Sequence, residues 1–238
     1  MKIMITPHPS WVDEFLDFID PYYNSIVNGL LFSELAAGTL SIERIRGGLL
    51  NFYPLIKNFP EYMALTLAKV PVENNPPNNM ARDWLIENIS IERRHQTWFR
   101  QWAVDFGVPR KALSKPIVPP PEMDAVNNYL WRVAGHGSLV EGISAVNYAI
   151  EGPSGQWTKL VARKIRAYEK QPGVTLRNGT LTWINAHASY DDRHPDEALE
   201  LIKAFAKTKQ EQEMVKLAAQ RSMEYYAMAA DACYEMFG

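Results

Sequence analysis

Two histidines and one aspartate near the middle of the C-terminal third have the spacing of metal ligands. His187, Asp191 and His194 follow one another at intervals of four and three residues. In a helix, where each residue turns by about 100°, this spacing places the three side chains on one face. Two imidazoles and a carboxylate on one face suit iron, zinc or manganese. The segment therefore predicts a helix, from about residue 180 to 193, that supplies part of a metal site.

A second segment with ligand character is Glu92-Arg-Arg-His95, and Glu151 is a further candidate. A carboxylate and an imidazole three residues apart lie on the same side of a helix, and di-iron carboxylate bundles use this Glu-x-x-His spacing. The combined donors suit two iron ions with open positions for dioxygen and a substrate. They are Glu92, Glu151 and Asp191 as carboxylates, and His95, His187 and His194 as imidazoles.

Each of these motifs also has a simpler interpretation. Glu-x-x-His is common by chance, and Glu151 by itself is a carboxylate at the end of a helix, before Gly152-Pro153. However, three of the five histidines fall within two motifs, which favours the metal site. The remaining two, His8 and His136, lie beside predicted loops and are interpreted as surface residues.

Helices are the elements predicted to position these residues. Apolar side chains recur at helical spacing from about residue 80 to 106, with Glu92 and His95 in the middle of the segment. A further amphipathic helix is expected from about residue 210 to 236. Strand patterns are almost absent, and no repeat has a fixed period. About seven to eight helices joined by short loops predict an all-α bundle, with residues 1–238 forming a single domain.

Capping and breaking signals predict where several helices begin and end. Ser138 and Glu141 have the spacing of a capping box, which predicts a helix that opens there and reaches Glu151. Gly152-Pro153 is expected to break this helix. Helices are also expected to be interrupted at Pro21 and Pro60, because proline cannot donate the backbone hydrogen bond that continues a helix.

Composition and charge exclude several classes of protein. The formal net charge is -2 and there is no polybasic run, so no nucleic-acid partner is expected. The single cysteine, Cys233, excludes an internal disulfide and suits the reducing cytoplasm. The chain has no uninterrupted apolar run of about 18 residues, and its N-terminal apolar run is too short for a signal peptide. We therefore expect a soluble cytoplasmic protein without a membrane span.

Three segments of the chain resemble a known family. Glu87–His95, Asn147–Trp157 and His187–Leu199 are similar, in this order, to segments of haem-oxygenase-like di-iron oxidases. More narrowly, they resemble the bacterial fatty-acid decarboxylases that form 1-undecene from lauric acid. Residues Asn58–Met63 and Met80–Leu85 extend the likeness over most of the chain.

The resemblance implies a fold of about seven helices, as in haem oxygenase and thiaminase II, but without haem. It implies two ferrous ions as cofactor and dioxygen as co-substrate. The implied reaction removes a hydrogen from the β-carbon of a medium-chain fatty acid, and loss of carbon dioxide then leaves a terminal alkene. The implied catalytic and metal-binding residues are Glu92, His95, Glu151, His187, Asp191 and His194.

Two related activities are disfavoured by single positions. Thiaminase II depends on a catalytic cysteine, whereas Cys233 lies near the C-terminus. A related branch converts one of its own tyrosines into p-aminobenzoate, and the matching position here is Phe32.

Two alternative functions stay open. A di-iron oxidase of this kind could fragment an amino acid or N-oxygenate an amine, and charged groups in the pocket beyond the irons would favour such a substrate. The other alternative is a non-enzymatic helical protein with a structural metal, although carboxylate-rich sites are a poor choice for structural zinc. The sequence also leaves open an electron donor and a homodimer.

Overall fold

The computed structural model describes residues 3–177, 179–189 and 193–237. Within these ranges the chain forms helices and no strands, so the predicted all-α fold is confirmed. The α-helices are α1 (Ser10–Val27), α2 (Leu30–Ala37), α3 (Ile42–Leu67), α4 (Pro76–Asp105), α5 (Pro121–His136), α6 (Leu139–Gly142), α7 (Ala149–Ala162), α8 (Thr182–Ala188), α9 (His194–Phe205) and α10 (Lys209–Met236). A π-helix, η1 (Ile143–Tyr148), joins α6 to α7, and a 3₁₀-helix, η2 (Ile165–Lys170), follows α7.

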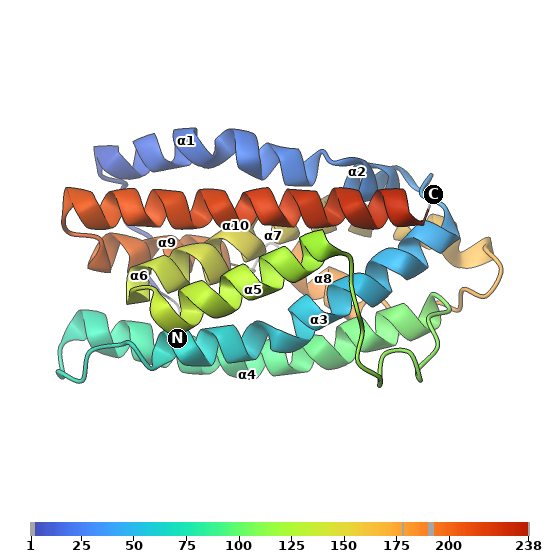
Figure 1. Cartoon of the computed structure of the whole chain (residues 1–238), viewed down its shortest axis with the longest axis horizontal. Helices are drawn as coiled ribbons and strands as arrows, with labels where there is room; N and C mark the ends of the chain where they lie inside the picture. The colour runs from blue at the N-terminus through green and yellow to red at the C-terminus, as the bar shows by residue number, and fades with distance from the viewer. Residues whose placement is uncertain (1–2, 178, 190–192, 238) are drawn as a thin grey trace.

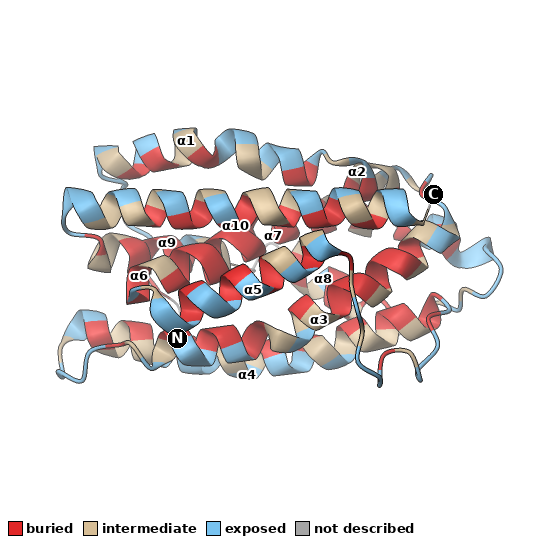
Figure 2. Cartoon of the chain, in the orientation of Figure 1, coloured by how far each residue is buried: buried red, intermediate tan, exposed pale blue. Residues whose placement is uncertain are grey.

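The longest helices run along the long axis of an elongated bundle (Figure 1). α3 packs along α4, while α10 packs against both α1 and α5. The short helix α8 contacts α4 and α7, and α9 contacts the same two helices. Buried residues form the inward faces of these helices and exposed residues their outer faces (Figure 2). The packing thus brings together the four helices that carry the candidate ligands. None of the helices in the described ranges is long and apolar enough to cross a membrane.

Three helices continue through prolines at which the sequence predicted an interruption. α1 contains Pro21, α3 contains Pro60, and α7 contains Pro153, so the expected breaks at these positions are wrong. An internal proline costs a helix about 3 kcal/mol or more. Burial of one large apolar side chain contributes roughly 1.5–3 kcal/mol, and α1 buries Ile19 before its proline and Ile26 after it. Packing on both sides of the proline therefore offsets the local cost.

The helical segment that begins after Ser138 changes its hydrogen-bond pattern before Glu151. Ser138 and Glu141 form the predicted capping box, with both reciprocal hydrogen bonds present. The π-helix η1 follows, and it is bonded to α10 through the hydroxyls of Ser144 and Ser222, which donate to Val215 O and Ala145 O, respectively. A π-helix holds more residues per turn than an α-helix. The direction of Glu151 therefore depends on η1 as well as on α7.

Candidate metal centre

Glu92 and His95 are buried on the inward face of α4, one turn apart. His95 Nδ1 lies 2.8 Å from Glu92 Oε1. Two ligand atoms bound to one ion at about 2.1 Å and at a right angle would be about 3 Å apart. The separation therefore suits a shared metal ion, and the Glu-x-x-His spacing directs both side chains to one point as predicted.

Glu151 lies in the first turn of α7 and is also buried. Its Oε1 accepts a hydrogen bond from Asn147 Nδ2 at 3.1 Å, and its Oε2 lies 3.2 Å from His194 Nδ1. Because α7 continues to Ala162, Glu151 is not the exposed carboxylate of a helix end. Its two oxygens are directed by partners on two different elements.

His187 lies in the last turn of α8, close to the ring of His95. The centroids of the two imidazoles are 4.5 Å apart. His187 Nδ1 lies 2.8 Å from the carbonyl oxygen of Trp183, and since a carbonyl can only accept, Nδ1 must carry the proton of this hydrogen bond. The neutral ring then has its lone pair on Nε2. A hydrogen bond of this kind commonly fixes the tautomer and ring orientation of a metal-bound histidine.

His187 and His194 lie on different helices, so the predicted single helix from about residue 180 to 193 is wrong. α8 ends at Ala188, and Ser189 has an extended backbone with ψ at 140°. α9 begins at His194 and has Pro195 in its first turn, a position where proline favours the start of a helix. The third residue of the predicted helix face, Asp191, lies outside the described residues. His187 and His194 therefore approach the centre from the ends of two helices and not from one face of a single helix.

The candidate residues form two groups that could each hold a metal ion. Glu92, His95 and His187 offer ligand atoms within 4.8 Å of one another, and so do Glu92, Glu151 and His194. Glu92 belongs to both groups, as a carboxylate that bridges two ions would. Five of the six residues expected from the sequence thus converge, and their carboxylates and imidazoles are donors that suit iron.

Burial raises the pKa of the Glu151 carboxyl group above its ordinary value, and the nearby Glu92 raises it further. Hydrogen bonds from His194 and Asn147 act in the opposite direction but do not cancel this effect. A carboxylate deprived of water is stabilised by a cation. Glu92 and Glu151 are both buried and offer oxygens within 4.8 Å of each other, so they are suited to a shared positively charged ligand.

The groups that orient these ligands were not predicted from the sequence. Asn147 lies four residues before Glu151, and the Trp183 carbonyl lies four residues before His187. The asparagine could have been found, because residues four apart are neighbours on a helix. The backbone carbonyl has no sequence signal, since every residue offers one.

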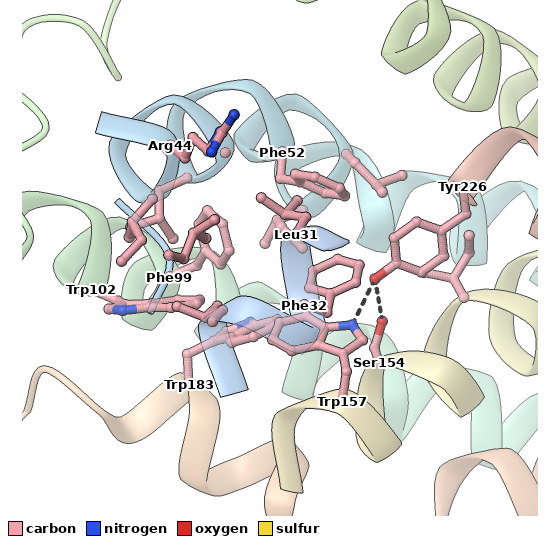
Figure 3. A pocket seen from close by; sticks show the side chains of 18 residues that line it. Leu31, Phe32, Arg44, Phe52, Phe99, Trp102, Ser154, Trp157, Trp183 and Tyr226 are labelled. Atoms are coloured by element: carbon pink, nitrogen blue, oxygen red, sulfur yellow. Dashed lines mark hydrogen bonds between the residues drawn. The ribbon is translucent and has the colours of Figure 1, made fainter. Parts of the chain in front are cut away.

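An apolar pocket with a cavity volume of about 50 Å³ is shown in Figure 3. Leu31 and Phe52 are among its aliphatic and aromatic walls from α2 and α3. Trp183 also lines the pocket, and its ring centroid is 4.1 Å from that of His187. Within the pocket, the Tyr226 hydroxyl bonds Ser154 Oγ and accepts from Trp157 Nε1. The pocket is thus mainly apolar and reaches the metal ligands through Trp183.

Phe32 and Cys233 are the two positions that argued against related activities, and both are buried. Phe32 lines the pocket and stacks on Trp157 with a centroid distance of 4.4 Å. Cys233 is fully buried in α10, and burial raises the pKa of its thiol to about 12. A thiol with this pKa remains protonated near neutral pH and is a poor nucleophile.

A family model described as iron-containing redox enzyme matches residues 46–227. The chain belongs to this family. The matched range includes all six residues expected to bind metal. No curated protein sequence matches the chain.

Several solved structures have the same fold as this chain. A TenA homologue from Pseudomonas syringae pv. tomato is 27% identical, with a TM-score of 0.87 over 99% of this chain and 100% of that one. A TenA homologue from Pyrococcus furiosus is 19% identical, with a TM-score of 0.72 over 94% of this chain and 99% of that one. A CADD-like protein of unknown function from Nostoc punctiforme is 13% identical, with a TM-score of 0.72 over 96% and 97%. These likenesses support the predicted haem-oxygenase-like fold.

Proposed function

We propose that the protein is a non-haem oxidase that uses dioxygen and a centre of two ferrous ions. The observation that carries this proposal is the pair of ligand groups that share Glu92. Membership in a family of iron-containing redox enzymes supports iron over zinc or manganese. The proposed ligands are Glu92, His95, Glu151, His187, Asp191 and His194.

Iron bound here would supply the electron-transfer chemistry that activates dioxygen. The chain's own part is to hold the ligands in place and to exclude water. The Trp183 carbonyl holds the ring of His187, and Asn147 holds the carboxylate of Glu151. Burial of Glu92 and His95 keeps bulk water from their side of the centre.

As the reaction, we propose oxidative decarboxylation of a medium-chain fatty acid to a terminal alkene. The pocket beside Trp183 would take the apolar tail and so leave the carboxyl end and the β-carbon beside the metal ligands. Removal of the β-hydrogen and of carbon dioxide yields two electrons and two protons, whereas reduction of dioxygen to water takes four electrons. The other two electrons would have to come from bound ferrous iron and be replaced before the next turnover, so we also propose an external electron donor as a partner.

The lack of carboxylates among the described residues of the pocket wall supports a fatty acid over an amine. Arg44 is the one charged side chain among the described residues that line the pocket. Its Nε donates to Tyr234 O, and its guanidinium lies 3.9 Å from the centroid of the Tyr234 ring. No described lining residue offers a carboxylate to pair with an ammonium group. An apolar tail needs no polar partner in such a pocket.

A fatty acid tail requires side chains in the pocket to move. The cavity volume is about 50 Å³, whereas a cavity of about 150 Å³ is known to hold benzene. Leu31, Leu35 and Leu49 line the pocket and can change rotamer without breaking a hydrogen bond. We therefore expect the affinity for fatty acids to include the cost of opening this space.

The proposal is tested by mixing the anaerobically iron-loaded protein with oxygenated buffer in a stopped-flow spectrometer. Lauric acid and dodecylamine serve as matched ligands, because both have twelve carbon atoms in an unbranched chain and differ in the terminal polar group. We expect a coloured transient that depends on lauric acid, and 1-undecene in the headspace. A transient that depends on dodecylamine instead would indicate an amine as the substrate. The absence of any transient in protein with iron bound would contradict the proposed oxidase activity. His136→Ala, at an exposed histidine of α5, is the control for nonspecific iron binding.

A further inference from the structure

The N-terminal segment crosses the beginning of α9 at Ile3, whose side chain is buried in the core. Ile3 N donates to Glu197 Oε1 at 3.1 Å, and Ile3 O accepts from Arg193 Nη2 at 3.2 Å. Arg193 directly precedes His194, and Glu197 follows it by three residues. The backbone of Ile3 therefore holds α9 on both sides of the candidate ligand.

The second oxygen of Glu197 connects α9 to α4. Glu197 Oε2 accepts from Trp84 Nε1 at 2.8 Å. The Trp84 ring in turn meets the His194 imidazole edge to face, with centroids 6.4 Å apart and an interplanar angle of 87°. α4 carries Glu92 and His95, so this bond joins the helix of one ligand group to the helix of the other.

The environment of Glu197 makes these bonds strong constraints. Glu197 is 6% exposed and Trp84 is 1% exposed. A buried carboxylate is costly unless its oxygens are hydrogen-bonded, and each oxygen of Glu197 has one N–H donor. The N-cap residue of α9, Arg193, makes no side-chain capping bond. The start of α9 is therefore held from outside the helix, through Glu197 and Ile3.

We propose that Glu197 is a positioning residue for the metal centre. By binding Ile3 and Trp84, it fixes His194 relative to Glu92 and so sets the affinity of the metal position formed with Glu151. The inference rests on the two-metal centre proposed above. The other position uses His95 and His187, neither of which lies on α9, and its affinity is expected to stay unchanged.

The first test is an anaerobic titration of the metal-free protein with Co²⁺, followed by calorimetry and by the visible absorption of the bound ion. The wild-type protein should bind two equivalents. Glu197→Gln keeps the size of the side chain but has one acceptor where two are needed. We expect it to bind the first equivalent normally and the second about tenfold more weakly, the scale on which outer-sphere partners of metal ligands act.

Glu200→Gln is the matched control on the same helix. Glu200 is also buried and also holds the N-terminal segment, accepting from Thr6 N and Thr6 Oγ1 at 2.8 Å each. It has no hydrogen bond to α4. We expect this variant to bind both equivalents with wild-type affinity, although its thermal stability should fall as in Glu197→Gln.

Trp84→Phe provides an independent variant, because it keeps an aromatic ring beside His194 and removes the indole N–H. It should lower the affinity for the second equivalent of Co²⁺ to a similar extent. The double variant with Glu197→Gln should bind this equivalent no more weakly than either single variant does. Equal weakening of both equivalents in Glu197→Gln, or of neither, would overturn the positioning role. Failure of the wild-type protein to bind two equivalents would instead overturn the proposed two-metal centre.

Discussion

The two halves of the candidate metal centre are built in different ways. In the first, Glu92 and His95 lie on one uninterrupted helix, and the α-helical period alone directs them to the same point. In the second, Glu151 follows a π-helix and His194 opens a new helix, so their approach depends on contacts between distant segments. A site can thus combine one pair of ligands that is fixed within a single helix with another pair that depends on the packing of the whole bundle.

The halves also differ in their access to water. The His95 side chain is 6% exposed, whereas that of His194 is 20% exposed. A more exposed ligand is held by fewer packing contacts and competes with water for the ion. We therefore expect the position with Glu92, His95 and His187 to fill first and the position with His194 to fill second.

Glu92→Ala should have the largest effect, because this carboxylate belongs to both ligand groups. We expect the variant to lose more than about a hundredfold in affinity for each of the two equivalents, beyond what an outer-sphere change costs. Metal analysis after anaerobic loading and desalting measures this loss. Alanine favours helix formation, so α4 and the far-ultraviolet circular dichroism should be preserved. Retention of one tight equivalent would show that the halves do not share Glu92.

His187→Ala and His194→Ala should each remove one position and leave the other. His187→Ala is expected to lose the tight equivalent, and His194→Ala the weak one, because the two histidines belong to different ligand groups. Both should lose oxygen-dependent activity, since the proposed chemistry needs both ions, while the helical fold stays intact. Calorimetric titration separates the two classes of site. Identical titration curves for the two variants would contradict the division into halves.

The sequence predicted the geometry within one helix better than the geometry between helices. The Glu-x-x-His spacing predicted the approach of Glu92 to His95, because a helix converts sequence distance directly into spatial distance. The same rule failed for His187 and His194, because it assumes one continuous helix and Pro195 starts a new one. His194 nevertheless lies close to Glu92 and Glu151. Its residue type and its place in the family pattern identified it, although the assumed geometry was wrong.

The fold shows where local signals compete with packing. Helix type and the capping box at Ser138 were predicted correctly, because periodicity and capping are local. Continuation through Pro60 and Pro153 was not predicted, because the burial that compensates for a proline comes from residues far away in the sequence. The π-helix and the bond from Trp84 to Glu197 are likewise products of tertiary contacts.

Asn147→Ala should weaken the second half more than the first. Asn147 donates directly to Glu151, so its loss is expected to lower the affinity for the second equivalent by about tenfold. Asn88→Ala is the matched control, because Asn88 lies four residues before Glu92 but donates to the Trp84 carbonyl. Asn88→Ala should therefore leave both affinities near the wild-type values. An equal effect of the two substitutions in the Co²⁺ titration would mean that the asparagines act only through stability.

Glu200→Gln should have the smallest effect, and it separates the stability of α9 from its role in metal binding. Burial raises the pKa of Glu200, but hydrogen bonds from Lys203 and Thr6 lower it more, so the pKa in the folded protein lies below the ordinary value. A lowered pKa stabilises the folded state above the unfolded-state pKa, and this contribution is lost as the pH falls through the folded-state pKa. The metal-free variant should thus be about 1 kcal/mol less stable than the wild type at pH 7. Urea unfolding should show this difference narrowing as the pH falls below about 4. A difference that is independent of pH would mean that the charge of Glu200 does not hold the N-terminal segment on α9.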